Sequence, residues 1–309
     1  MFISGHLIVK ETTNFGKMML TAALESVKDF VDELIVIDNG CSCSVQDAMT
    51  RFNINFDGHW SETSMEGDFS ELRNKALENM NPKANYIFQF DSYDIFWPQN
   101  LNKMRTVLGN EEQRYKWTGR FYHFMESPFF YQSIEKHTNL YPAVLDMKWE
   151  KSVHEELVYG DGYKFEEKDL GEQYIWTHWG YVRSVIHITL KWLYYDYLEF
   201  GNVDRYKEKD SLLAEMGIND ILIDRIPLLK RFKKSFPPAA WKYLIAPYEK
   251  SSSLDWQHWV KNIDPQFLQF EQDFHSVAFE EGQVGYVKGT RPYIKSIERI
   301  FDEKLWEKF

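Results

Sequence analysis

The chain has few cysteines and no long apolar run, and each lack excludes a class of protein. Its 309 residues include two cysteines, Cys41 and Cys43. A disulfide between residues so close is strained, and two sulfurs do not complete a zinc site, so we expect free thiols in a reducing compartment. No stretch approaches the roughly 20 apolar residues of a membrane-spanning helix, and the first residues lack the features of a signal peptide. The sequence therefore predicts a cytoplasmic protein without a transmembrane segment.

Basic residues are also outnumbered. There are 36 Lys and Arg against 47 Asp and Glu, which gives a net charge of −11. A surface that follows nucleic-acid phosphates is therefore not expected. A small anionic substrate is still compatible with this charge, because a bound divalent cation inverts the local sign.

The N-terminal part alternates strand and helix signals. The apolar run Phe2–Val9 predicts a buried strand, and apolar residues at helical spacing predict a helix over Lys17–Val31. A second apolar run, Leu34–Ile37, stops at a turn sequence that begins at Asp38. Two strands joined by one helix favour a parallel sheet.

The same pattern then repeats. Asp68 is suited to cap a helix, with Glu71 as its capping-box partner, and Tyr86–Phe90 predicts a third strand that ends at Asp91. Asp38 and Asp91 therefore stand at the C-terminal ends of two strands. In open α/β sheets this is the edge at which ligands bind.

The second half of the chain has a different character. Trp117–Met125 and Val153–Tyr159 are typical of strands, whereas the pattern after Tyr181 is helical. The expected helices are Ser184–Phe200, Asp204–Met216 and Ile221–Phe232. We predict an α/β catalytic domain over residues 1–182 and a mainly helical region over residues 183–309.

Several stretches resemble, in order, motifs of the family 2 glycosyltransferases with the GT-A fold. They are Ile3–Glu11, Asp32–Ser42, Trp60, Asp68–Leu77, Phe88–Asp94, Val153–Leu157 and Thr177–Tyr181. The second of these is similar to the family's DE-hydrophobic-D-x-G-S stretch. The resemblance covers about residues 1–182 and implies a mixed, mainly parallel sheet flanked by helices.

The resemblance implies a hexosyltransferase-type enzyme that moves a sugar from a nucleotide-diphosphate donor, with a UDP-sugar favoured, to a hydroxyl of a saccharide or lipid-linked acceptor. Inversion at the sugar is part of what the resemblance implies. Such a reaction requires a neutralised leaving group and a base for the acceptor hydroxyl. Mn2+ or Mg2+ ordinarily neutralises the diphosphate, and oxygen ligands with one imidazole suit these ions.

The nucleotide-binding roles implied by the resemblance fall on four residues. Asp38 is expected to bind the base, Arg73 to contact the nucleotide, Asp91 to support the ribose and the metal, and Lys10 to assist. The alternatives are that Asp38 is a turn former and that Arg73 is a solvated helix residue.

The acidic motif departs from the family's Asp-x-Asp form. Tyr93 stands at its third place, and the second carboxylate follows at Asp94. We favour metal binding through Asp91 or Asp94 with help from His178. The alternatives are that basic side chains neutralise the diphosphate and that His178, which lies among tryptophans, is a packed core residue.

Glu155 is the expected general base, and His154 is the expected acceptor or phosphate contact. Repulsion from neighbouring Glu156 is expected to raise the pKa of Glu155, which suits a base. The alternative is that Glu155 and Glu156 form a solvated pair in a loop.

Other functions stay open at this point. A basic cluster is suited to peripheral membrane contact or, as we favour, to a solvated helix face; its members are Arg225, Lys230, Arg231, Lys233 and Lys234. A nucleotidyltransferase-like metal-phosphate enzyme is one alternative activity. A non-catalytic binding or scaffold protein with a degenerate GT-A fold is another, and Tyr93 is the residue that favours it.

Overall fold

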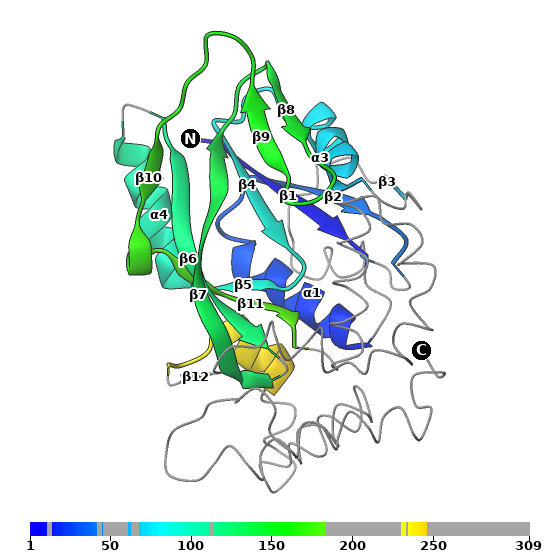
Figure 1. Cartoon of the computed structure of the whole chain (residues 1–309), viewed down its shortest axis with the longest axis vertical. Coiled ribbons are helices and arrows are strands. Elements are labelled where there is room, and N and C mark those ends of the chain that lie inside the picture. The colour runs from blue at the N-terminus through cyan, green and yellow to red at the C-terminus, as the bar shows by residue number, and fades with distance from the viewer. Residues whose placement is uncertain are drawn as a thin grey trace, which may run out of the picture. The chain divides into compact units, whose positions relative to one another are not determined.

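The computed structural model describes residues 1–10, 14–41, 45, 61–62, 68–111, 114–125, 127–182, 230–232 and 234–245. A sheet runs in the order β3-β2-β1-β4-β7-β6-β11-β5, with β10 beside β6 and β12 beside β7 (Figure 1). Its strands are β1 (Ile3–Val9), β2 (Glu33–Asp38), β3 (Ser61–Glu62), β4 (Tyr86–Asp91), β5 (Asp94–Phe96), β6 (Lys116–Met125), β7 (Ser127–Pro142), β10 (Glu167–Asp169), β11 (Ile175–Tyr181) and β12 (Lys230–Arg231). The hairpin β8 (Met147–Glu150) and β9 (Glu156–Tyr159) stands apart as a second sheet. The helical elements are α1 (Asn14–Val27), α3 (Phe69–Glu78), α4 (Pro98–Asn110), η1 (Gly171–Gln173), α9 (Pro238–Ala240) and η2 (Trp241–Ile245).

The first strands of the chain form a parallel core. β1 lies between β2 and β4 and runs parallel to both. β4 pairs antiparallel with β7, and β5 pairs antiparallel with β11, so the sheet is mixed. Helices cover it on both faces, which confirms the α/β fold class that the sequence predicts.

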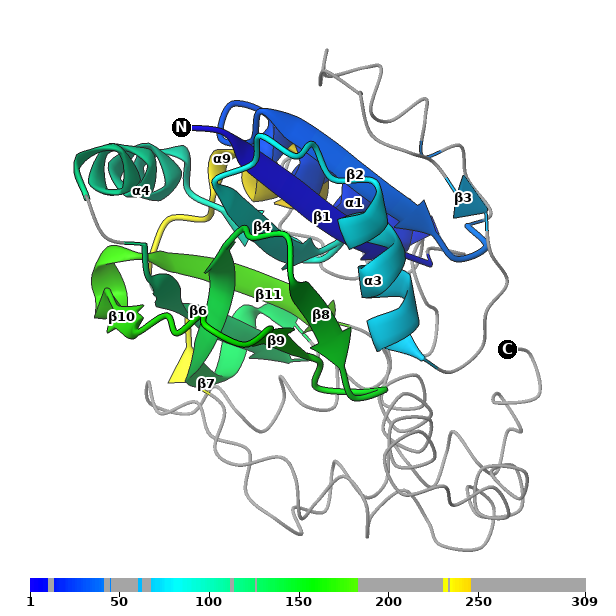
Figure 2. The same cartoon turned by 90° about the horizontal axis from the view of Figure 1, so that it is seen from above.

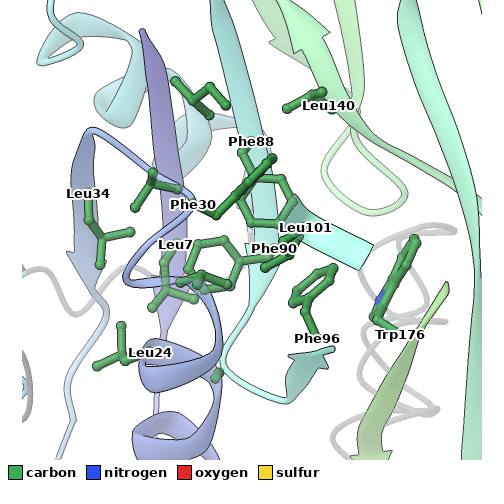
Figure 3. Close-up of a cluster of buried hydrophobic side chains, with 14 of the residues drawn as sticks. Leu7, Leu24, Phe30, Leu34, Phe88, Phe90, Phe96, Leu101, Leu140 and Trp176 are labelled. Carbon is green, nitrogen blue, oxygen red and sulfur yellow. The ribbon is translucent and has the colours of Figure 1, made fainter. Parts of the chain in front are cut away.

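The larger core fills the face of the sheet that α1 and α4 cover. Leu7 and Leu24 lie in it beside the rings of Phe30 and Phe88 (Figure 3). The Phe88 ring centre lies 5.0 Å from that of Phe30 and 5.2 Å from that of Phe96, both edge-on. Burying each such side chain stabilises the fold by about 1.5–3 kcal/mol, so this face contributes a large share of the stability.

The opposite face of the sheet is covered by α3, and the hairpin β8–β9 lies against that helix (Figure 2). Leu72 and Ala76 of α3 pack against Ile35 and Ile37 of β2. The buried Trp149 joins Ile87 of β4 and Tyr141 of β7 in a further apolar cluster, and its ring centre lies 5.3 Å from that of Tyr141. The hairpin therefore packs both on α3 and directly on the main sheet.

The start of α3 is determined locally. Asp68 has extended backbone angles, and its Oδ1 accepts hydrogen bonds from the backbone N–H groups of Ser70 and Glu71. A carboxylate in this position satisfies donors that the helix itself leaves unpaired. The predicted cap is confirmed, and it places Arg73 in the second turn of the helix.

The chain divides into two compact units. The first holds the described residues up to 121, of 135–178 and of 236–245; the second holds those of 122–134, 179–182 and 230–235. In the first unit, α9 and η2 pack against α1, and Lys242 Nζ lies 2.9 Å from Glu25 Oε2. Residues 183–229 and 246–309 lie outside the described residues, so the boundary at residue 182 and the helices beyond it stay predictions. None of the helices in the described ranges is long and apolar enough to cross a membrane.

The predicted helix Ile221–Phe232 is wrong at its C-terminal end. Lys230–Arg231 form β12, which pairs antiparallel with β7, and the ring of Phe232 lies 5.0 Å from that of Tyr122. The backbone of β7 and this ring contact outweigh the local helical pattern. Lys234 of the basic cluster lies 5.2 Å from the Tyr122 ring centre. Arg225 and Lys233 of the cluster lie outside the described residues, and membrane contact stays a prediction.

His6, in the middle of β1, makes the stability of the fold dependent on pH. Its side chain is fully buried, and Nε2 lies 3.0 Å from Ser4 Oγ. Burial, with a smaller effect from the charge of Arg73, lowers the pKa of His6 to about 3. The unfolded chain binds this proton near pH 6.5 and the folded protein does not, so the stabilisation is complete above pH 6.5 and declines down to about pH 3.

We expect the difference in unfolding free energy between the wild type and His6→Gln to shrink by about 2 kcal/mol when the pH falls from about 6.5 to about 5. The reason is that Gln does not titrate. Urea denaturation of both proteins at each pH measures the difference. Equal losses in the two proteins would show that His6 does not carry this dependence.

Candidate functional site

A tight connection at the C-terminal end of β4 forms the centre of the site. Asp91 ends β4, and β5 begins three residues later at Asp94. The backbone N–H of Asp91 donates to Asp94 Oδ2 at 3.0 Å, so the buried second carboxylate closes the turn that carries the first. The carboxylate of Asp91 is 31% exposed and is accessible to a ligand.

Arg73 joins the end of β4 to the segment before β9. Its Nη2 lies 3.1 Å from Asp91 Oδ1, and its Nε lies 3.3 Å from Glu155 Oε1. The Arg73 side chain is 4% exposed. Burial opposes its charge, but the carboxylates of Glu155 and Asp91 together outweigh burial and raise the pKa of the guanidinium above its usual value. The structure thus contradicts the interpretation of Arg73 as a solvated helix residue.

One donor atom of this guanidinium has no hydrogen-bond partner among the described residues. Nη1 of Arg73 is buried and makes no hydrogen bond to the described residues. Leaving a buried charged donor unpaired costs more than a neutral one, and a ligand acceptor atom at Nη1 relieves that cost. The site therefore presents a cationic donor between two carboxylates.

A second group of polar side chains is built around Asp94. Its Oδ1 lies 2.8 Å from His178 Nδ1 and accepts from Trp176 Nε1 at 3.2 Å. His178 lies level with Asp94 where β11 pairs with β5. Its ring contacts Tyr93 edge-on at 4.7 Å and Phe121 at 5.0 Å. With Nδ1 held in this way, the ring orientation of His178 is fixed.

Glu155 is held by a loop with unusual backbone angles. Lys151 and His154 have φ values of 71° and 56°, which non-glycine residues seldom adopt. The carbonyl of Ser152 accepts from the backbone N–H of Phe69, which ties the loop to the start of α3. Glu156 pairs with Lys151, so the two neighbouring glutamates have different partners. The interpretation of both as one solvated pair is therefore wrong.

The structure joins five of the eight predicted site residues. Arg73, Asp91 and Glu155 form one group, which the hydrogen bond from Asp91 N–H links to Asp94 and His178.

The other three site residues lie apart from this network in the described part of the chain. Lys10 and His154 are exposed. Asp38 is buried, and its Oδ1 accepts from the N–H groups of Gly40 and Cys41. In the sheet, Asp38 is aligned with Val9 of β1, whereas Asp91 is aligned with Ile8 of the same strand. Because successive residues of a strand point to opposite faces of the sheet, the two aspartates are directed to opposite faces. Asp38 therefore is a turn former, and its contact with a base stays a prediction.

A divalent cation fits this site only with help from its substrate. Among the described residues, no group of three or more His, Cys, Asp or Glu side chains is arranged to hold a metal. The oxygens of Asp94 are already hydrogen-bonded to the Asp91 N–H, the Trp176 indole and the His178 ring. Mg2+ and similar ions are commonly held by one or two carboxylates together with substrate phosphates. Asp91, to which Asp94 links His178, offers one carboxylate for that smaller requirement.

Two site residues were not found from the sequence. Asn74 bonds the backbone of Trp149, and the Trp149 ring lies 5.9 Å from the Arg73 guanidinium carbon. Asn74 follows Arg73 directly within the helix, but no sequence pattern indicates that its partner lies in β8.

We expect Arg73→Met to lower the free energy of unfolding by about 3 kcal/mol, because two carboxylates lose their shared cation. This is the low end for a broken buried pair, since Asp91 is 31% exposed. Arg120→Met, which breaks a solvent-facing pair with Asp169, should cost less than about 1 kcal/mol. Urea denaturation measures both, and equal losses would contradict a structural role for the Arg73 pairs.

Comparisons with known proteins give similarity of structure without similarity of sequence. No family model matches the chain, and no curated protein matches it. The chain is similar to S. aureus TarS 1-349, at 11% identity and a TM-score of 0.39, over 100% of this chain and 93% of that one. It is similar to glucosyl-3-phosphoglycerate synthase from Mycobacterium tuberculosis in complex with Mg2+ and UDP, at 16% identity and a TM-score of 0.29, over 39% of this chain and 43% of that one. It is also similar to HddC from Yersinia pseudotuberculosis, at 10% identity and a TM-score of 0.34, over 58% of this chain and 94% of that one. Values this low do not determine what this chain binds.

Proposed function

We propose that this protein transfers a sugar from a nucleotide-diphosphate donor to an acceptor hydroxyl. The observation that carries the proposal is the buried Arg73 at the C-terminal end of β4, which pairs with Asp91 and Glu155 through Nη2 and Nε while its Nη1 makes no hydrogen bond to the described residues. That edge of an α/β sheet is where ligands bind. The resemblance of the sequence motifs to family 2 glycosyltransferases supports the same reaction, with a UDP-sugar as the favoured donor.

The donor nucleotide is bound by the group around Arg73. Nη1 of Arg73 donates to an acceptor atom of the nucleotide, and the exposed part of Asp91 supports the ribose. Asp38 and Lys10, at the ends of β2 and β1, contact the base and the phosphates in this proposal.

Asp91 and His178 would hold a divalent cation together with the donor phosphates. Asp94 is then an orienting partner and not a ligand, because a metal-binding histidine usually has its other ring nitrogen bonded to a carboxylate or carbonyl. The cation supplies positive charge to the leaving diphosphate.

Glu155 acts as the general base for the acceptor. The acceptor oxygen forms a bond to the anomeric carbon while the bond from that carbon to the diphosphate oxygen breaks, and Glu155 takes the acceptor proton. Arg73 Nε donates to Glu155 Oε1 at 3.3 Å, and this bond fixes the orientation of the carboxylate. Attack from the side opposite the leaving diphosphate inverts the anomeric centre, as the family resemblance implies.

We expect one nucleotide sugar to be hydrolysed slowly in a screen of UDP-, GDP- and dTDP-sugars with and without Mn2+. Release of free nucleoside diphosphate supports glycosyl transfer, whereas release of pyrophosphate would indicate a nucleotidyltransferase. Asp91→Asn should abolish both this turnover and the thermal shift caused by UDP with Mn2+, because Asp91 is proposed to hold the nucleotide and the metal. Asp169→Asn, which alters the pair with Arg120, is the control and should behave as the wild type.

We expect Glu155→Gln to spare donor binding and to lower kcat by about 10²–10⁴, the usual effect of losing a general base. Glu156→Gln is the matched control, since Glu156 is the exposed neighbour of Glu155 and forms its described ion pair with Lys151. Steady-state kinetics and nucleotide titration separate the two quantities. Full activity of Glu155→Gln would exclude Glu155 as the base.

A further inference from the structure

We infer that Asn74 is the residue that positions Glu155, an inference that rests on the proposed role of Glu155 as the base. Asn74 stands next to Arg73 on α3 and is partly buried. It contacts neither Asp91 nor Glu155 in the described hydrogen bonds, so it acts through another segment. That segment is the hairpin β8–β9.

The Asn74 carboxamide binds one residue of β8 through both of its polar atoms. Its Nδ2 donates to the Trp149 carbonyl at 2.9 Å, and its Oδ1 accepts from the Trp149 N–H at 2.8 Å. This pair of bonds is what a neighbouring strand gives a residue in a sheet. Trp149 is fully buried, so its backbone groups need such partners.

The attachment through Asn74 helps to fix the position of the hairpin. It has two strands, with Trp149 opposite Leu157, and it forms a sheet separate from the main one. A two-stranded hairpin is marginally stable by itself, so its placement is set by what it packs against. Trp149 packs on Ile87 and Tyr141 of the main sheet. α3 adds hydrogen bonds that fix the backbone of the hairpin, through Asn74 and through the bond from Phe69 N–H to the Ser152 carbonyl.

Glu155 takes its position from the same hairpin. It directly precedes β9 and follows the loop in which Lys151 and His154 have positive φ. A loop with two such residues persists only where its surroundings hold it. Two neighbouring residues of α3 therefore hold Glu155 in different ways. Arg73 binds its carboxylate, and Asn74 binds the hairpin that Glu155 precedes. A displacement of about 1 Å at a reacting group reduces rates by about 10²-fold.

The experiment compares Asn74→Ala with Asn79→Ala in the full chain. Asn79 is the matched control, because it caps the same helix by donating to the Lys75 carbonyl and its described hydrogen bonds stay within α3. We expect Asn74→Ala to lower kcat of donor hydrolysis by about 10–100-fold while the affinity for UDP with Mn2+ changes by less than about 3-fold. Amide hydrogen exchange in β9 should accelerate in Asn74→Ala and stay unchanged in Asn79→Ala.

A double variant separates positioning from general destabilisation. If Asn74 acts through Glu155, adding Asn74→Ala to Glu155→Gln should lower kcat by no more than about 2-fold further. Losses that multiply would overturn the inference, as would unchanged exchange in β9. Asn74→Asp, which keeps the side-chain size and one of the two bonds, replaces Asn74→Ala in each measurement if the alanine variant does not fold. A wild type that hydrolyses no donor would overturn the proposed function, whereas the exchange comparison would still test the attachment of the hairpin.

Discussion

The buried guanidinium of Arg73 is the constraint on which the site depends. Two carboxylates from distant parts of the chain, Asp91 and Glu155, are held near each other by one cation that is 4% exposed. A pair of like charges in a partly buried place is unfavourable without a cation between them. The cation, in turn, requires both carboxylates because burial opposes its charge. The three side chains therefore stabilise one arrangement together and each loses its place without the others.

The second group, around Asp94, is built on a different principle. Asp94 is buried, and its oxygens serve a backbone N–H, an indole N–H and an imidazole nitrogen. A carboxylate with this many partners is a support for its neighbours, and it links the turn after β4 to β11. Tyr93 and Asp94 both contact His178: the ring of Tyr93 packs edge-on against the imidazole, and Asp94 orients it.

Much of the fold was predictable from local patterns. Apolar runs located β1, β2 and β4, and Asp68 marked the start of α3, because burial and capping act on neighbouring residues. The position of Asp91 at the C-terminal end of β4 followed from the strand signals. The helix expected to reach Phe232 was wrong at its end, because the edge of β7 offers partners that no local pattern contains.

The sequence alone determined which residues carry charge at strand ends and helix starts, and the tertiary structure decided which of them meet. Arg73 and Glu155 are 82 residues apart, and their contact depends on the docking of the hairpin β8–β9 against α3. Asp38 and Asp91 look equivalent in the sequence, yet a one-residue difference in register directs them to opposite faces of the sheet. Both outcomes arise from long-range packing and strand alignment, and neither is encoded in the residues next to the side chains concerned.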